Sequence, residues 1–254
     1  MAKRVNVDTP VKIDATGVSH RELNIKLREA VANGAQKIQL HNVHGQRYIG
    51  TDLNKPVEIN IFGTPGNDLG AFMDGPQIIV HGNAQDGCGN TMNNGQIIVH
   101  GHAGDIIGMS ARGGSIFVKE DIGYRAGIHM KEYEEKQPVI VVGGTAQDFL
   151  GEYMAGGILV LLGLNLCQGE HHKAKFVGTG THGGVIYLRG SIEQYQLGKE
   201  VGTTELKGKD SQTLQKLVGK FATYFGYDAE KILNHKFIKL YPKYLRPYGR
   251  LYVY

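Results

Sequence analysis

The chain has no tryptophan and only two cysteines among its 254 residues. Cys88 and Cys167 stand far apart, without the paired spacing of a zinc or iron–sulfur site, and two cysteines do not make a disulfide framework. No hydrophobic run is long enough to cross a membrane, because the longest, at residues 156–165, is short and rich in glycine. The first thirty residues have no signal-peptide core. We therefore expect a cytoplasmic protein without membrane contact.

Strong charge of one sign is also missing. The formal net charge is +4, and the basic residues are scattered along the chain until its last thirty residues. Nucleic-acid binding usually needs a basic patch or stripe, so no nucleic-acid partner is predicted. The hydrophobic content of 41% is enough for a sizeable core in a chain of this length.

Glycine, in contrast, is abundant, and its positions repeat. Four similar segments, at residues 57–63, 77–82, 96–101 and 115–120, end nineteen residues apart. The loop glycines Gly70, Gly89, Gly108 and Gly127 have the same spacing. A fixed period of about twenty residues is typical of a solenoid, in which each coil buries its apolar face against its neighbours.

The repeated segments predict two columns of apolar side chains that point into the solenoid. The first column is Ile59, Ile78, Ile97, Ile116, Val139, Leu159 and Ile186. The second is Ile61, Val80, Val99, Val118, Val141, Leu161 and Leu188. Stacked β-branched residues of this kind fill the core of a parallel β-helix. Two later coils are longer, and we expect their insertions, residues 130–137 and 170–181, to protrude.

The side chains between these columns should point outward, and most of them are apolar. They are Asn60, Ile79, Ile98, Phe117, Ile140, Val160 and Tyr187. Such a ridge would seldom stay uncovered on a monomer. Two covers stay open at this point: the N-terminal helix or C-terminal helical region of the chain itself, or another molecule, which is either a partner subunit or a second copy of this chain. The interface candidates are Ile79, Ile98, Phe117, Ile140, Val160 and Tyr187.

The repeat occupies residues 51–195 and divides the chain into three segments. Residues 1–50 predict strands at 4–7, 10–13 and 35–41 around a helix that begins at Ser19, where Glu22 completes a capping box. We interpret this segment as a cover for the first coil. Residues 196–254 predict a helix from Asp210 or Ser211 to Gly226 and a shorter one after Asp228. The tyrosine-rich and basic end, residues 237–254, favours packing on the body or on a partner over stacking on nucleotides.

Few residues suggest catalysis or metal binding. His81 and His100 would be stacked neighbours on the outward side, and His171 and His172 lie near Glu170, but stacked outward histidines are more typical of a surface or an interface than of a metal site. Ser110 is the candidate nucleophile of a small-ester hydrolase, although its surroundings are not a G-x-S-x-G elbow. Asp86 and Asp148 occupy equivalent loop positions, which suggests that they accept backbone N–H bonds and brace the coil. No catalytic, cofactor or metal site is predicted.

The loop pattern supports a family resemblance. Residues 82–95, 101–114 and 143–157 repeat the pattern G-x-A-x-D-x-x-G-x-x-M-x-x-G with small variations. This pattern resembles the glycine-repeat (GXGXG) domain that ends the large subunit of glutamate synthase, and one of the subunits of formylmethanofuran dehydrogenases is similar. Residues 45–50 and 246–249 look like the ends of free-standing versions of this domain. The repeat glycines are Gly82, Gly89, Gly95, Gly101, Gly108, Gly114, Gly143, Gly151 and Gly157.

The resemblance implies a mainly β fold, a right-handed parallel β-helix with an N-terminal α/β cap and a C-terminal helical region. It also implies a scaffold subunit without catalysis of its own. The partners would be a glutamine amidotransferase subunit and an FMN/iron–sulfur synthase subunit, which would carry the FMN and the clusters in a hetero-oligomer. The equivalent subunit of a formylmethanofuran dehydrogenase-like complex and the ester hydrolase based on Ser110 stay open as alternatives.

Overall fold

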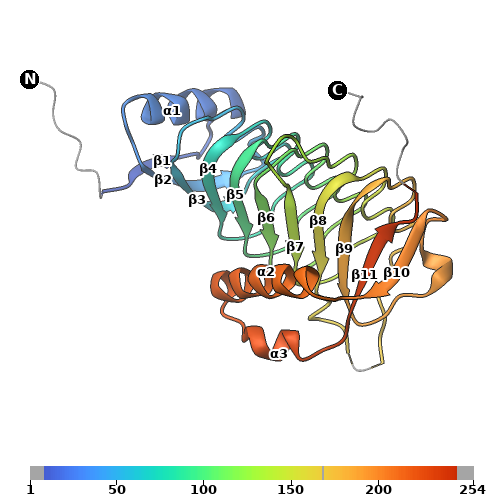
Figure 1. Cartoon of the computed structure of the whole chain (residues 1–254). Helices are drawn as coiled ribbons and strands as arrows, with labels where there is room; N and C mark the ends of the chain where they lie inside the picture. The colour runs from blue at the N-terminus through green and yellow to red at the C-terminus, as the bar shows by residue number, and fades with distance from the viewer. Residues whose placement is uncertain (1–8, 168, 245–254) are drawn as a thin grey trace, which may run out of the picture.

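The computed structural model describes residues 9–167 and 169–244. In this part of the chain, parallel strands stack into a β-solenoid with few helices (Figure 1). The strands form a single sheet in the order β1-β2-β3-β4-β5-β6-β7-β8-β9-β11-β10. They are β1 (Val11–Asp14), β2 (Lys37–His44), β3 (Glu58–Thr64), β4 (Asp74–Val80), β5 (Asn94–Val99), β6 (Ser115–Val118), β7 (Val139–Val142), β8 (Ala155–Leu161), β9 (Gly183–Arg189), β10 (Val201–Glu205) and β11 (Phe237–Pro242).

The two predicted inward columns are confirmed through β6. Ile59, Ile78, Ile97 and Ile116 pair one above another in parallel register, and all are buried in the main core. The second column continues in the same way from Ile61 to Val118. Each coil thus repeats the last one because the same residue types recur every nineteen positions.

The prediction was wrong by one residue at β7. Ile116 pairs with Ile140, and Val118 pairs with Val142, so these two side chains point inward in place of Val139 and Val141. Ile140, predicted as an interface residue, is therefore a core residue that is 1% exposed. The insertion in the preceding coil changes the nineteen-residue spacing, so the spacing could not be used to align β7. An error of one residue in this alignment moves every side chain of the strand to the opposite face. The prediction is correct again in β8 and β9, where Leu159 and Ile186 follow Ile140.

The N-terminal end of the solenoid carries the helix α1 (His20–Ala32), which lies at one end of the stack (Figure 1). The Ser19 hydroxyl accepts the backbone N–H of Glu22 at 3.2 Å, as the capping box predicts. Leu23, Leu27 and Val31 recur on one helical face and are buried in the main core. β1 covers most of the strand predicted at residues 10–13, whereas the strand predicted at residues 4–7 lies outside the described residues.

The C-terminal segment contains α2 (Lys209–Phe225), α3 (Ala229–Leu233) and the short 3-10 helix η1 (Gln194–Gln196). α2 ends at Gly226 in a left-handed conformation, and the Asp228 side chain caps α3. This segment also adds two strands that were not predicted. β11 pairs antiparallel with β9, and β10 pairs antiparallel with β11. The motif at residues 246–249 lies outside the described residues.

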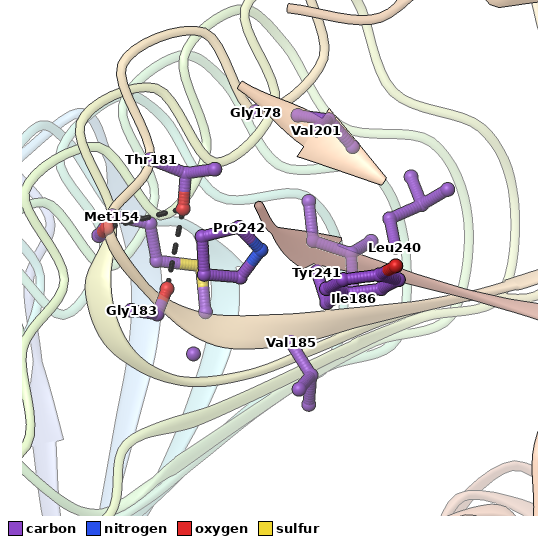
Figure 2. Close-up of a pocket in the computed structure, with 11 residues that line it drawn as sticks. Met154, Gly178, Thr181, Gly183, Val185, Ile186, Val201, Leu240, Tyr241 and Pro242 are labelled. Carbon is purple, nitrogen blue, oxygen red and sulfur yellow. Dashed lines mark hydrogen bonds between the residues drawn. The ribbon is translucent and has the colours of Figure 1, made fainter. Parts of the chain in front are cut away.

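β10 and β11 close the C-terminal end of the core. Figure 2 shows the small apolar space that is left there between the two strands and β9, lined by side chains such as Met154, Ile186 and Leu240. The Thr181 hydroxyl lies 3.1 Å from the Met154 carbonyl oxygen and 3.2 Å from that of Gly183. The space measures about 10 Å³, room for one water, so it is a packing gap.

Candidate interaction surfaces

The outward face of the sheet is covered over its C-terminal half by α2, which runs across the strands (Figure 1). Phe117, Val160 and Tyr187 are at most 2% exposed, and they form a second hydrophobic cluster with α2. Val141 takes the outward position that was predicted for Ile140. The helix contributes Leu214, Leu217, Val218 and Phe221 to this cluster. Of the two covers left open by the sequence, the chain's own C-terminal part covers these positions.

A hydrogen-bond network fixes the N-terminal end of α2 to the sheet. The Tyr187 hydroxyl donates to Asp210 Oδ1 at 2.6 Å, and Lys239 Nζ lies 2.8 Å from Asp210 Oδ2. Burial, followed by the bond to Asp210, raises the pKa of Tyr187. Burial would raise the pKa of Asp210, but the bonds from Lys239 and Tyr187 outweigh it and lower that pKa. The three groups join β9, α2 and β11.

Within the part of the chain that the structure describes, the N-terminal half of the same face is left open by α2. Ile79 is half-buried, and Ile98, beside the end of α2, is 3% exposed. Four rings form a column along the next outward row, with centroid distances of 4.8 Å, 4.5 Å and 5.6 Å and nearly parallel planes. The rings belong to His41, Phe62, His81 and His100. Phe225 of α2 meets the last ring edge-on at 5.2 Å.

Polar side chains beside this ring column are paired with each other. The His81 ring bonds through Nε2 to Asn60 Oδ1 at 2.8 Å. Gln77 donates to Gln96 at 2.7 Å, and the Tyr224 hydroxyl of α2 donates to the same oxygen at 3.1 Å. Together with Phe62 and Ile79, these groups give the open face a mixed apolar and hydrogen-bonding character. Protein interfaces have the same character.

Two histidines of the ring column, His81 and His100, favour the neutral form. Partial burial lowers the pKa of His81, and burial, His81 and Lys119 lower the pKa of His100. The ring column therefore disfavours added positive charge. His41 Nε2 is buried and has no hydrogen-bond partner in the described structure.

The loop side of the solenoid lies away from α2 (Figure 1). Its turns are built on left-handed backbone. Each coil places three residues with positive φ two positions apart, as at Ile106, Gly108 and Ser110, with φ of 51°, 62° and 55°. The first and third N–H groups donate to one neighbouring coil and the middle one to the other, as in Ile106 to Tyr124 and Gly108 to Cys88. Alternating hydrogen bonds thus lock the coils together.

The middle left-handed position is a glycine in every described coil. A Cβ on Gly108 would lie 2.5 Å from Ile140 Cδ1, so the middle position faces the core. Gly89 and Gly151 occupy the same position and would contact Ile116 and Ile186. Gly82, Gly101 and Gly143 lie close to atoms of the preceding coil just after the strands, and Gly95, Gly114 and Gly157 do so at strand starts. The repeated glycines therefore lie where coils approach each other.

The first and third left-handed positions face outward and carry large side chains. They include Tyr48, Phe72, Arg125, His129, Phe149, Tyr153 and Phe176. A left-handed conformation costs about 1–2 kcal/mol for a residue with a side chain. Residues in such strained conformations are concentrated at functional sites, and they persist only where the surrounding structure holds them in place. Here the alternating hydrogen bonds hold them.

Neighbouring coils stack these side chains on each other. Phe149 and Phe176 stack at 4.9 Å, and His129 and Tyr153 at 5.4 Å. The Arg125 guanidinium lies 4.7 Å from the Phe149 ring centroid and pairs with Glu152. Ser110 lies one coil before His129, and no hydrogen bond joins its hydroxyl to that ring in the described structure. Sequence reasoning missed this surface, because only its glycine column repeats in residue type.

The remaining candidates do not converge. His172 is buried, bonds through Nε2 to the Arg189 carbonyl oxygen at 3.0 Å, and has a lowered pKa chiefly because of burial. His171 bonds to the Ser191 hydroxyl. Asp86 and Asp148 accept the backbone N–H groups of the next coil, at Asp105 and Lys175, which confirms their bracing role. Within residues 9–167 and 169–244, no three His, Cys, Asp or Glu side chains could hold a metal ion, and no helix could span a bilayer.

The fold places this protein in the class of β-solenoids with inward glycines at the turns of their coils. The sequence of the chain also shows its family. The GXGXG motif family model matches residues 13–246, so the chain belongs to the GXGXG family. An uncharacterized protein of Methanocaldococcus jannaschii is 49% identical over 250 residues, which is 95% of this chain and 96% of that protein. The family match includes both end segments as well as the repeat.

Proposed function

We propose that the chain is a scaffold subunit of a glutamate-synthase-like oxidoreductase complex of nitrogen metabolism in the cytoplasm. The match to the GXGXG family over residues 13–246 carries this proposal. The partners are a glutamine amidotransferase subunit and an FMN/iron–sulfur synthase subunit, which perform the chemistry. The proposal includes a right-handed coil, with residues 1–50 and 196–254 as its end caps.

The flavin and the iron–sulfur clusters belong to the partners in this proposal. An iron–sulfur cluster usually takes four cysteine thiolates, whereas this sequence has two cysteines. Burial raises the pKa of Cys88 to about 12, so its thiol is protonated at neutral pH, and Cys167 is exposed. Neither residue suits cluster binding.

The open half of the sheet face supports the proposal as the place where a catalytic partner docks. It offers Phe62 and Ile79 as apolar contacts beside paired polar groups, and α2 leaves it uncovered. Of the predicted interface residues, Ile79 is the one that lies fully on this open half, with Ile98 at its border.

Affinity purification of the tagged chain from its native cells, with quantitative mass spectrometry, tests the proposal. We expect the amidotransferase and the FMN/iron–sulfur polypeptides in near-stoichiometric amounts. Molybdopterin-enzyme subunits in their place would favour the formylmethanofuran dehydrogenase-like alternative. A chain recovered without either set of partners would contradict the scaffold function.

A variant pair tests the docking face. Ile79→Asp should release the partners while the thermal midpoint stays within a few degrees of that of the wild type. Ile25→Asp is the matched control, because Ile25 is 47% exposed on α1, away from the sheet face. Loss of partners in both variants, or in neither, would show that they do not dock on this face.

A further inference from the structure

The coils that lead into β7, β8 and β9 present a second surface, the aromatic wall. We define it by Arg125, His129, Phe149, Tyr153 and Phe176. Phe176 is 50% exposed and Tyr153 is 47% exposed. Tyr124, 46% exposed, precedes Arg125 and lies at the border of the wall. This wall is on the loop side of the solenoid, so it is separate from the sheet face that α2 partly covers (Figure 1).

The charged groups of the aromatic wall are paired within the chain. Arg125 lies over the Phe149 ring and forms an ion pair with Glu152, which is 6% exposed. Asp148 accepts the Lys175 backbone N–H at 2.8 Å. A charged ligand would have to break these pairs. The wall therefore suits an apolar protein surface.

The fold does not require aromatic side chains at these positions. The left-handed conformation of Phe149, Tyr153 and Phe176 favours glycine or asparagine, and glycine occupies the first position of an earlier coil, at Gly87, and the third position of the Phe176 coil, at Gly180. Exposed aromatic side chains therefore remain where the backbone would favour small residues. Aromatic residues and arginine are enriched at protein interfaces.

The size and the period of the wall indicate its occupant. The exposed side chains of the wall and its border offer roughly 500 Å² of surface, since five of them (Tyr124, Arg125, His129, Tyr153 and Phe176) are about half uncovered and each has about 200 Å². Two such walls would bury about 1,000 Å², which is the lower limit for a specific interface. The ring spacing of 4.9 Å and 5.4 Å follows the spacing of the strands.

A surface whose side chains have the same spacing can contact the wall ring by ring. The aromatic wall of a second copy of this chain has this spacing. We propose that two copies associate through their aromatic walls around a two-fold axis. Each residue of one wall then meets the wall of the other copy, as an isologous interface requires. The sheet faces stay free for the partners described above, and the proposal does not depend on them.

Sedimentation velocity of the purified chain, from about 1 to about 100 µM, tests this dimer. The wild type should form a dimer in this range. Phe176→Asn and Tyr153→Asn should each weaken the association at least tenfold. Both should keep a thermal midpoint close to that of the wild type, because asparagine tolerates left-handed backbone.

Phe72→Asn is the matched control. Phe72 is also left-handed and 50% exposed, but it lies four coils before the Tyr153 coil, outside the wall. This variant should dimerise like the wild type. A wild type that is monomeric at about 100 µM would overturn the proposal. So would wall variants that dimerise normally, or a control that loses the dimer equally.

Discussion

The Tyr187 hydroxyl, on the outward face of β9, donates a hydrogen bond of 2.6 Å to the Asp210 carboxylate in the first turn of α2. Tyr187→Phe should lower the free energy of unfolding by about 1.5–3 kcal/mol, the usual contribution of a hydrogen bond to a charged group. Chemical denaturation measures the change. Tyr224→Phe is the control, because its hydroxyl bonds to the neutral Gln96 side chain, and it should cost about 1 kcal/mol. Equal losses would show that the charge of Asp210 adds nothing.

The same carboxylate predicts an acid dependence. The pKa of Asp210 is lower in the folded chain than its ordinary value of 3.8. Its stabilisation is therefore fully present above the unfolded-state pKa and is lost as the pH falls through the lowered pKa. Stability curves of wild type and Asp210→Asn should converge as the pH falls below the ordinary carboxyl value of 3.8 and through the lowered pKa. A constant difference between the curves at all pH values would contradict this assignment.

Two histidines of the ring column predict a second pH dependence. The pKa values of His81 and His100 are lowered, so the fold favours the neutral rings. Their contribution is full above the unfolded-state value of about 6.5 and declines as the pH falls below it. His100→Phe should reduce the stability change between about pH 7.5 and pH 5.5. Buried His172 contributes a slope of the same sign, and this slope should remain in the variant.

An alanine should destabilise the fold more at an inward left-handed glycine than at a left-handed glycine with open space around it. Gly108→Ala combines left-handed strain with a Cβ 2.5 Å from Ile140 Cδ1, whereas Gly45 has a φ of 76° with nothing within 4 Å of an added Cβ. Gly45→Ala should therefore cost about 1–2 kcal/mol, from strain alone. Gly108→Ala should cost about 1–3 kcal/mol more because the core is overpacked. Similar thermal midpoints for the two variants would argue against an inward position of Gly108.

The register of β7 can be tested directly. Ile140→Asp would place an unpaired charge in the core and should cost about 4 kcal/mol or more. Val139→Asp, at a half-buried position, should cost less. If Val139→Asp lowers the free energy of unfolding more than Ile140→Asp does, Val139 and not Ile140 points into the core.

The sequence predicted the period and the core of the solenoid because identical isoleucines recur at fixed spacing from Ile59 to Ile116. It failed at Ile140, since an insertion removes the spacing and the run of four apolar residues at 139–142 has no alternation to set the phase. β11 was missed because its mixture of aromatic, basic and apolar residues has no strand period. The strand is set by pairing with β9, a contact that only the fold creates.

The site was predicted less completely than the fold. The outward apolar row was visible from alternation, but which part α2 covers depends on helix placement. The aromatic wall could not be predicted from the sequence, because the first and third left-handed positions of the coils accept residues as different as Asp68, Ile106, Arg125 and Phe149. What these residues share is a positive φ. The sequence does not indicate a positive φ where the residue is not glycine.

The reversal of chain direction at β11 has a consequence for growth of the assembly. A parallel solenoid that ended on β9 would offer an open template on which the first strand of another molecule could continue the stack, and repeated addition would give a fibre. β11 runs the opposite way, and β10 returns to the direction of β9 but exposes Thr203, Thr204 and Glu205 in place of an apolar column. A parallel newcomer such as β1 would not extend the inward columns beyond this point. The last two strands therefore fix the length of the solenoid and help to keep the protein a discrete particle.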